Sequence, residues 1–215
     1  AFENIIMGKL FGTDGIRGIA NSYPIIPEVA VNVGIAVASI LNADHGRPRV
    51  IIGQDTRLSG DMLAHALSAG VCAAGADAEL VGVLSTPGIA FATRASQASA
   101  GIVVSASHNP YQDNGIKIFD ADGFKLPDEK EAELERLILS DEKPSFQEKR
   151  GPIIGRARYN PNAAAVYAAF LKNCARTGQG DGGFKIVLDC AHGATYEIAP
   201  RIFTELGFDV KALNV

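Results

Sequence analysis

The sequence contains no tryptophan, only three cysteines and few aromatic residues, which make up 7% of the chain. The cysteines, Cys72, Cys174 and Cys190, are odd in number and far apart, and no Cys-x-x-Cys pair occurs. This spacing gives no support to a disulfide scaffold or a zinc site. We interpret the cysteines as small core residues in a reducing compartment, which predicts a cytoplasmic protein.

Long apolar runs and an excess of positive charge are also missing. No run approaches the roughly 18 residues typical of a membrane span. The net charge is −4, without the basic stripe that a nucleic-acid-binding surface needs. We therefore expect neither a membrane nor a nucleic-acid partner. The 215 residues, 47% hydrophobic and 20% charged, instead fit one to two globular domains with an ample core.

Apolar strand-like runs alternate with helix-like segments through the first two thirds of the chain. This alternation predicts a three-layer α/β/α sandwich with a mixed, largely parallel sheet. The antiparallel component is expected from a turn at Asp113-Asn114-Gly115. Ser59 is a candidate helix N-cap. The predicted strands are Arg49–Gly53, Ala78–Val83, Gly101–Ser105 and Ile116–Phe119, and the predicted helices are Glu28–Leu41, Gly60–Ala76, one that begins at Thr86-Pro87, and Asp128–Ser140.

A second module is predicted in the last third of the chain. The segment Asp141–Pro161 is rich in charge, Gly and Pro, and is our candidate domain boundary. The elements that follow form one βαβ unit, the start of a second, similar domain. They are a helix over Pro161–Arg176, a strand over Phe184–Asp189, a helix over Ala199–Leu206 and a strand over Asp209–Val215. We divide the chain into an extension or tag remnant (1–6), a first domain (7–157) and a truncated second domain (158–215).

Chemically versatile side chains concentrate just after the strand Gly101–Ser105. Ser107 and His108 precede Pro110, which places them on a turn at the rim of the sheet. Lys117 alternates with Ile116 and Ile118 and should point away from the face that they bury. A hydroxyl, an imidazole and an ammonium suit phosphoryl transfer through a serine intermediate. A polar loop with no catalytic role is the simpler alternative on spacing alone.

Two arginines are candidates for binding phosphate. Arg17 lies in the glycine-rich run Gly12–Gly18 and offers a fork of donors that matches phosphate oxygens. The alternative is a hairpin with a solvated arginine. Arg57 follows the strand Arg49–Gly53 at its carboxyl end, where α/β sheets usually place ligands. It either contacts phosphate or bridges to Asp55.

Two of these stretches resemble one known family. The string SASHNPYQDNGIKIFDADGFKL, from Ser105 on, is similar to the active-serine loop of the α-D-phosphohexomutases, most closely in the bacterial phosphoglucosamine mutase branch. KLFGTDGIRG, from Lys9 on, resembles the family's amino-terminal strand and loop. The resemblance implies the same three-layer fold and an enzyme that interconverts glucosamine 6-phosphate and glucosamine 1-phosphate, through a phosphoserine and a bisphosphorylated sugar, in amino-sugar nucleotide and cell-wall precursor synthesis.

The resemblance also assigns roles to individual residues. It implies that Ser107, Lys117, His108 and Arg17 are catalytic and that Asn109, Thr13 and Arg57 bind substrate. It further implies Mg²⁺ bound through phosphorylated Ser107, with its remaining ligands beyond Val215. The expected partner is a hexosamine phosphate, with a homodimer left open.

Three other functions stay open at this point. Because the sugar-selecting residues are expected beyond Val215, a phosphomannomutase/phosphoglucomutase is the nearest alternative. An N-terminal fragment that is inactive alone and only binds phosphate is the second. A serine hydrolase is the third, although the chain lacks the Gly-x-Ser-x-Gly motif.

Overall fold

The computed structural model describes residues 10–41, 47–140, 154–175 and 184–215. The predicted extension 1–6 and residues 141–153 of the predicted domain boundary lie outside these ranges. Among the described helices, none is long and apolar enough to cross a membrane.

A six-stranded mixed sheet forms the centre of the larger part of the molecule, in the order β1-β5-β4-β2-β3-β6. The three pairs from β4 to β6 are parallel, and β5 pairs antiparallel with both β4 and β1. This confirms the prediction of a mixed, largely parallel sheet. The strands are β1 (Ile16–Ile19), β2 (Arg49–Gln54), β3 (Asp77–Val83), β4 (Ala100–Val104), β5 (Asp113–Phe119) and β6 (Ala157–Tyr159).

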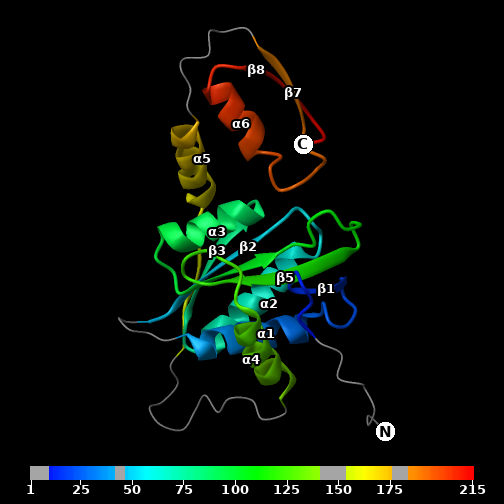
Figure 1. The fold of residues 1–215 in the computed structure, drawn as a ribbon, viewed down its shortest axis with the longest axis vertical. Helices are drawn as coiled ribbons and strands as arrows, with labels where there is room; N and C mark the ends of the chain where they lie inside the picture. The colour runs from blue at the N-terminus through cyan, green and yellow to red at the C-terminus, as the bar shows by residue number, and fades with distance from the viewer. Residues whose placement is uncertain (1–9, 42–46, 141–153, 176–183) are drawn as a thin grey trace.

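Helices cover both faces of this sheet, so the three-layer sandwich is also confirmed (Figure 1). One face packs against α1 (Pro27–Ile40), α2 (Gly60–Ala73) and α4 (Asp128–Leu139). The other face packs against α3 (Thr86–Ala95), which lies on β2 and β4. Side chains such as Ile102 and Val103 point to opposite faces and are both fully buried, because β4 lies in the middle of the sheet.

A smaller body sits beyond α3 and contains the last part of the chain (Figure 1). Its two parallel strands, β7 (Lys185–Asp189) and β8 (Asp209–Leu213), are joined by α6 (Ile198–Glu205), which gives the predicted βαβ unit. The helix α5 (Ala163–Cys174) packs between α3 and α6. Buried Tyr167 and Ile198 therefore belong to the same apolar cluster as Ile89 of α3. This cluster connects the smaller body to the sandwich.

Three local predictions were wrong. Asp113-Asn114-Gly115 is not a turn but the start of β5, because these residues pair with β1, Gly115 opposite Arg17. Ser59 occupies the N-cap position of α2 without capping it, since its Oγ accepts a hydrogen bond of 2.8 Å from Asn114 Nδ2. The predicted strands omitted β6, which lies in the candidate domain boundary and pairs with β3. The predicted boundary at 157/158 thus falls within an edge strand of the first sheet, and the division into domains stays a prediction.

We expect Gly101→Ala to destabilise the sandwich. A Cβ at this position of β4 would lie 2.2 Å from Oγ1 of Thr93, a fully buried side chain that donates to the Ile89 carbonyl. Overpacking of this kind costs about 1–3 kcal/mol of unfolding free energy, measurable by chemical denaturation. The double variant Gly101→Ala/Thr93→Ala removes the clashing hydroxyl and should regain part of that loss. Equal stability of Gly101→Ala and the wild type would contradict the packing described here.

Candidate functional site

The predicted serine loop connects the end of β4 to the start of β5 at the rim of the sheet. Ser107 is exposed and adopts a left-handed backbone with φ of 57°, which is uncommon for a residue other than glycine. Its backbone N–H donates to Ser105 Oγ at 3.0 Å. Its own Oγ lies 3.4 Å from Nδ1 of His108. The loop thus presents the Ser107 hydroxyl to solvent beside an imidazole.

Arg57 holds this loop in place from the neighbouring strand end. Its side chain is 9% exposed, and its Nε donates to Asp55 Oδ2 at 3.0 Å. Its two terminal nitrogens donate to four carbonyls of the serine loop, those of Ser107, Asn109, Pro110 and Asp113, at 2.6–3.0 Å. A guanidinium has five N–H groups, so every one is used. Arg57 therefore positions the serine loop and leaves no donor for a phosphate in this arrangement.

The Asp55 carboxylate forms hydrogen bonds with both Arg57 and the serine loop. Its Oδ2 accepts a hydrogen bond of 2.6 Å from Ser105 Oγ in addition to the bond from Arg57 Nε. The side chain of Asp55 is 13% exposed. Because Ser105 Oγ in turn accepts the Ser107 N–H, one chain of hydrogen bonds runs from the carboxylate to the backbone of the candidate nucleophile. These hydrogen bonds hold the Ser107 backbone in its left-handed conformation. Uncommon backbone conformations that are held in this way cluster at functional sites.

A cluster of charges lies on the same face of β1 and β5. The carboxylate of Asp14 pairs with Lys117 Nζ at 2.9 Å and with Arg17 Nη2. Arg17 Nη1 also donates to Asn109 Oδ1 at 3.2 Å, which connects the cluster to the serine loop. The hydrogen bond from Lys117, with the positive charges of Lys117 and Arg17, lowers the pKa of Asp14. Asp14 is therefore ionised at neutral pH and bridges two cations.

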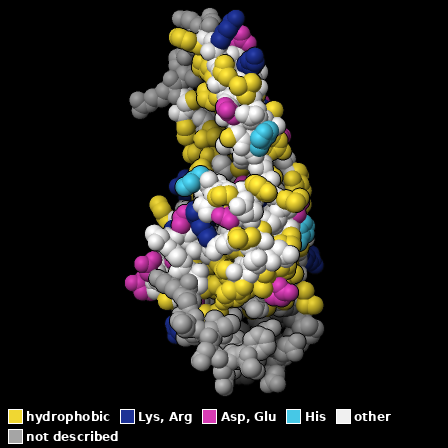
Figure 2. Space-filling model, turned by 90° about the vertical axis from the view of Figure 1, so that its right-hand side faces the viewer, with side chains coloured by type: hydrophobic (Ala, Val, Ile, Leu, Met, Phe, Trp, Pro, Cys, Tyr) yellow, Lys and Arg dark blue, Asp and Glu magenta, His cyan; other side chains and the backbone are white. Residues whose placement is uncertain are grey.

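The register between β1 and β5 creates this cluster. Ile16 pairs with Ile116 and Arg17 with Gly115, so Arg17 and Lys117 fall on one face while both isoleucines enter the core. A Cβ on Gly115 would lie 3.1 Å from the Arg17 side chain, so the glycine makes room for it. Since α3 packs on β2 and β4, Arg17 and Lys117 keep 25% and 18% exposure of their side chains. Figure 2 shows basic, acidic and histidine side chains gathered at mid-height on the left of that view.

The structure brings most of the predicted site residues together. Ser107, His108 and Asn109 share the loop, and Arg17 and Lys117 meet through Asp14. The orientation predicted for Lys117 is confirmed, since Ile116 and Ile118 are buried on the opposite face. Thr13 is exposed in the turn before Asp14. The catalytic and substrate-binding roles of these residues stay predictions.

Sequence reasoning missed three residues that hold the site together. Asp14 was part of the glycine-rich motif, but its pairing with Lys117 depends on strand register. Ser105 was noted only as the strand end, although its hydroxyl supports Ser107. Asp113 was assigned to a turn, whereas its Oδ2 accepts a hydrogen bond of 3.0 Å from Asn109 Nδ2. The presence of all three residues within the quoted motifs was the only available signal.

The smaller body contacts the rim of the sheet near the serine loop. Thr56 Oγ1, next to Arg57, donates to the carbonyl of His192. Ala191 and His192 are both left-handed, with φ of 48° and 52°. Within the described ranges, no group of three or more His, Cys, Asp or Glu side chains could hold a metal ion. A complete metal site is therefore not formed by the described residues alone.

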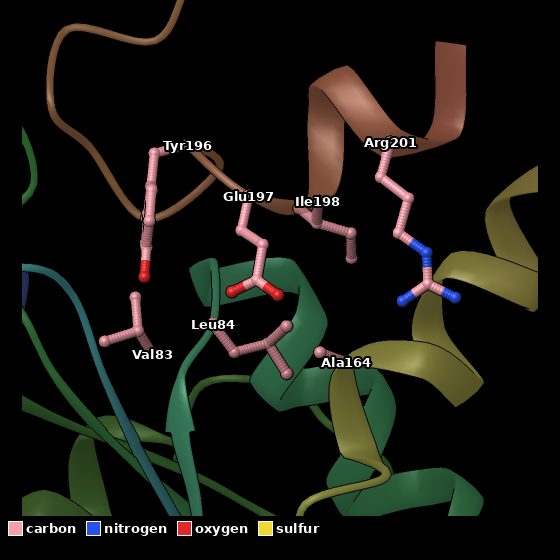
Figure 3. Close-up of a pocket in the computed structure, with 8 residues that line it drawn as sticks. Val83, Leu84, Ala164, Tyr196, Glu197, Ile198 and Arg201 are labelled. Atoms are coloured by element: carbon pink, nitrogen blue, oxygen red, sulfur yellow. The ribbon is translucent and has the colours of Figure 1, made fainter. Parts of the chain in front are cut away.

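A pocket between α3, α5 and α6 is a separate feature (Figure 3). The carboxylate of Glu197 points toward the start of α3, and Arg201 extends toward α5. The pocket has a volume of about 20 Å³, which is room for about one water molecule. It is too small for a sugar phosphate. The exposed serine loop and the Arg17, Lys117 and Asp14 cluster are our candidate site because their chemistry suits phosphate.

Comparisons with known proteins identify the family of this chain. Residues 8–145 match the family model described as phosphoglucomutase/phosphomannomutase, alpha/beta/alpha domain I. A phosphoglucosamine mutase of Desulfotalea psychrophila is 52% identical over 97% of this chain and 46% of the relative. That of Syntrophotalea carbinolica is 53% identical over 96% of this chain and 45% of the relative. The chain thus spans about half the length of these curated relatives.

Solved structures show the same fold. A phosphoglucomutase/phosphomannomutase family protein from Burkholderia thailandensis superposes with a TM-score of 0.77 at 27% identity, covering 96% of this chain and 44% of that one. The family model, which matches more than half of the chain, covers both the serine loop and the Arg17 motif. The chain therefore belongs to the phosphoglucomutase/phosphomannomutase family, and its residues 8–145 match the α/β/α domain I of that family.

Proposed function

We propose that this chain carries the phosphoserine of a phosphoglucosamine mutase and that Ser107 is the residue phosphorylated. The observation that carries the proposal is the Ser107 loop: an exposed hydroxyl on a left-handed backbone, with the loop carbonyls bound by four of the five donors of Arg57. Such a rigid loop suits a group that must receive and return a phosphoryl group in one fixed geometry. The curated relatives named phosphoglucosamine mutase, 52% and 53% identical, favour glucosamine 6-phosphate as the substrate.

The first half-reaction moves the phosphoryl group from Ser107 to the sugar. A sugar hydroxyl attacks phosphorus, a new sugar O–P bond forms, and the bond between phosphorus and Ser107 Oγ breaks. The hydroxyl loses a proton and Ser107 Oγ gains one, and His108 Nδ1, 3.4 Å from that oxygen, is placed to deliver it. Reversal of this step at the other phosphate of the bisphosphorylated sugar regenerates phosphorylated Ser107 and releases the isomer.

Charge stabilisation comes from the cluster beside the loop. A phosphoserine carries about −1.5 to −2 charges at neutral pH, and every step moves this group. Arg17 and Lys117 supply two positive charges in a partly buried position, where they stabilise more strongly than in bulk water. Lys117 can also donate a proton to an oxygen that develops charge. Thr13 and Asn109 remain our candidates for sugar or phosphate hydrogen bonds, and Arg57 acts by fixing the loop.

Magnesium is part of the proposal. The phosphate oxygens of phosphorylated Ser107 are hard ligands of the kind that Mg²⁺ prefers. The described residues offer no further acidic cluster, so Ser107 is the one metal ligand that we assign in this part of the chain. When bound, the ion would neutralise charge on the transferred phosphoryl group.

The proposed setting is cytoplasmic amino-sugar metabolism that feeds cell-wall precursors. Cys72, Cys174 and Cys190 are all unpaired thiols, in keeping with a reducing compartment. The division into domains 7–157 and 158–215, the inactivity of this chain by itself and a homodimer are further proposals. A phosphomannomutase/phosphoglucomutase remains the second candidate, because we assign only phosphate binding and transfer to the described site and expect other residues to select the sugar.

The test is a single-turnover transfer from the phosphorylated protein. We expect mass spectrometry of the intact protein to show one phosphatase-sensitive phosphoryl group, located on Ser107 by peptide fragmentation. Mixing with glucosamine 6-phosphate should move that group to the sugar faster than mixing with glucose 6-phosphate or mannose 6-phosphate. A preference for either of the last two sugars would replace the proposed substrate, and a phosphoryl group on another residue would contradict the assignment of Ser107.

A further inference from the structure

The Asp14 carboxylate occupies the position where a phosphate would be expected. Lys117 and Arg17 are partly buried cations beside the serine loop, and both pair with this one carboxylate. A phosphoryl group carries more negative charge than a carboxylate and needs the same donors. As long as Asp14 stays, it neutralises half of the positive charge that a phosphate could use.

Arg17 differs from Arg57 in how completely its donors are used. Within the described part of the chain, Arg17 bonds through Nη1 to Asn109 and through Nη2 to Asp14, and its buried Nε has no partner. Arg57, by contrast, uses all five N–H groups. An unpaired buried donor is unfavourable. The Arg17 guanidinium therefore has donor capacity left for another acceptor, whereas Arg57 has none.

Asp14 is the member of the cluster best able to move. Its side chain is 53% exposed, against 25% for Arg17 and 18% for Lys117. It lies in a short turn closed by a hydrogen bond of 2.9 Å from Gly12 N to Gly15 O, ahead of β1, whereas both cations project from paired strands. A carboxylate that swings away from the cations enters water directly, so it needs no new protein partner.

We propose that Asp14 is an internal stand-in for the phosphate, which holds Lys117 and Arg17 together in the empty site and is displaced from them when a phosphoryl group binds. This inference rests on the proposed function, since it assumes that the cluster receives the phosphate. Asp14 is then a positioning residue: it keeps the two like charges at their working separation between turnovers. Displacement also offsets part of the phosphate's binding free energy, which favours release of product.

Replacing Asp14 tests whether it is displaced by phosphate or stays bound to both cations, because the two cases predict different changes in phosphate affinity. The intact protein, treated with phosphatase, is titrated with inorganic phosphate in a calorimeter at neutral pH. We expect Asp14→Asn to bind phosphate about five- to tenfold more tightly than the wild type, the range expected for two partly exposed ion pairs. A carboxylate that stays bound to both cations would give equal or weaker binding, and that result would overturn the proposal.

Two controls isolate the competition. Asp122→Asn removes the same charge from an exposed turn outside the cluster and should leave phosphate affinity within about twofold of the wild type, because exposed charges contribute little. Asp14→Asn in a Lys117→Gln background should lose most of the gain, since the competition needs Lys117. A full gain without Lys117 would also overturn the proposal.

A measurement on the unmodified protein avoids dependence on the variants. NMR of the Asp14 carboxyl carbon gives its pKa, and saturating inorganic phosphate should raise this pKa back toward or above its ordinary value. An unchanged pKa would show that phosphate leaves the two ion pairs intact. Failure of the proposed mutase function would be distinguishable, because it would remove sugar-phosphate turnover in the wild type while leaving the phosphate titrations interpretable.

Discussion

Ser107→Ala is expected to abolish mutase turnover in the intact protein, by about four orders of magnitude or more, because the proposed reaction has no other phosphoryl carrier. The fold should persist. Ser107 is exposed, and the hydrogen bond that it gives to Ser105 comes from its backbone N–H, which alanine retains. We expect the unfolding free energy to stay within about 0.5 kcal/mol of the wild type. Steady-state turnover and chemical denaturation measure the two quantities.

Ser105→Ala is the matched control for this variant. It removes a hydroxyl two residues away, together with its bonds to Asp55 and to the Ser107 backbone, but keeps the proposed nucleophile. It should lose about 1–2 kcal/mol of stability and still acquire a phosphoryl group on Ser107. Turnover of Ser107→Ala close to that of the wild type would rule out Ser107 as the carrier.

Arg57→Lys is expected to reduce both stability and turnover, although it conserves the charge. Lysine has three donors on one nitrogen, whereas Arg57 bonds to Asp55 and to four carbonyls of the serine loop from three nitrogens. The loss should be about 2–4 kcal/mol of unfolding free energy, because Asp55 is nearly buried and loses part of its pairing. With the loop released, kcat should fall about a hundredfold, since misplacement by an ångström has effects of this size.

Arg94→Lys provides the corresponding control, as Arg94 is exposed in the last turn of α3. It should change neither stability nor kcat measurably. If Arg57→Lys raised KM about a hundredfold with kcat and stability unchanged, Arg57 would be a direct phosphate ligand, one of the two alternatives left open by the sequence, and not a residue that positions the loop.

Elements with strong local patterns were predictable from the sequence. The run Ala100–Val104 is apolar throughout because β4 is covered on both faces, and the alternation around Lys117 correctly placed its ammonium opposite Ile116 and Ile118. Local turn chemistry misled where a distant strand competed for the same backbone. Asp113-Asn114-Gly115 has the composition of a turn, but its pairing with β1 stabilises an extended conformation.

The contacts that complete the site could not be predicted, because they join residues far apart in the sequence. Arg57 was assigned two alternatives, and only the folded loop shows that its donors reach carbonyls more than fifty residues away. The same holds for Asp14 and Lys117, which meet through strand register. The three-residue strand β6 carries one arginine and no aliphatic residue larger than alanine, and it is exposed along its length, so it lacks the hydrophobic pattern of a strand.

The pairing of Ile16 with Ile116 has a consequence for how the chemistry is encoded. A shift of β1 by one residue against β5 would turn Ile16 to the surface and bury Arg17, because successive side chains of a strand point to opposite faces. The burial of Ile16 in the edge strand β1 thus fixes the position of the positive charge of Arg17. The apolar side chain of Ile16 thus determines on which face of the sheet the Arg17 side chain lies, although Ile16 has no functional group of its own.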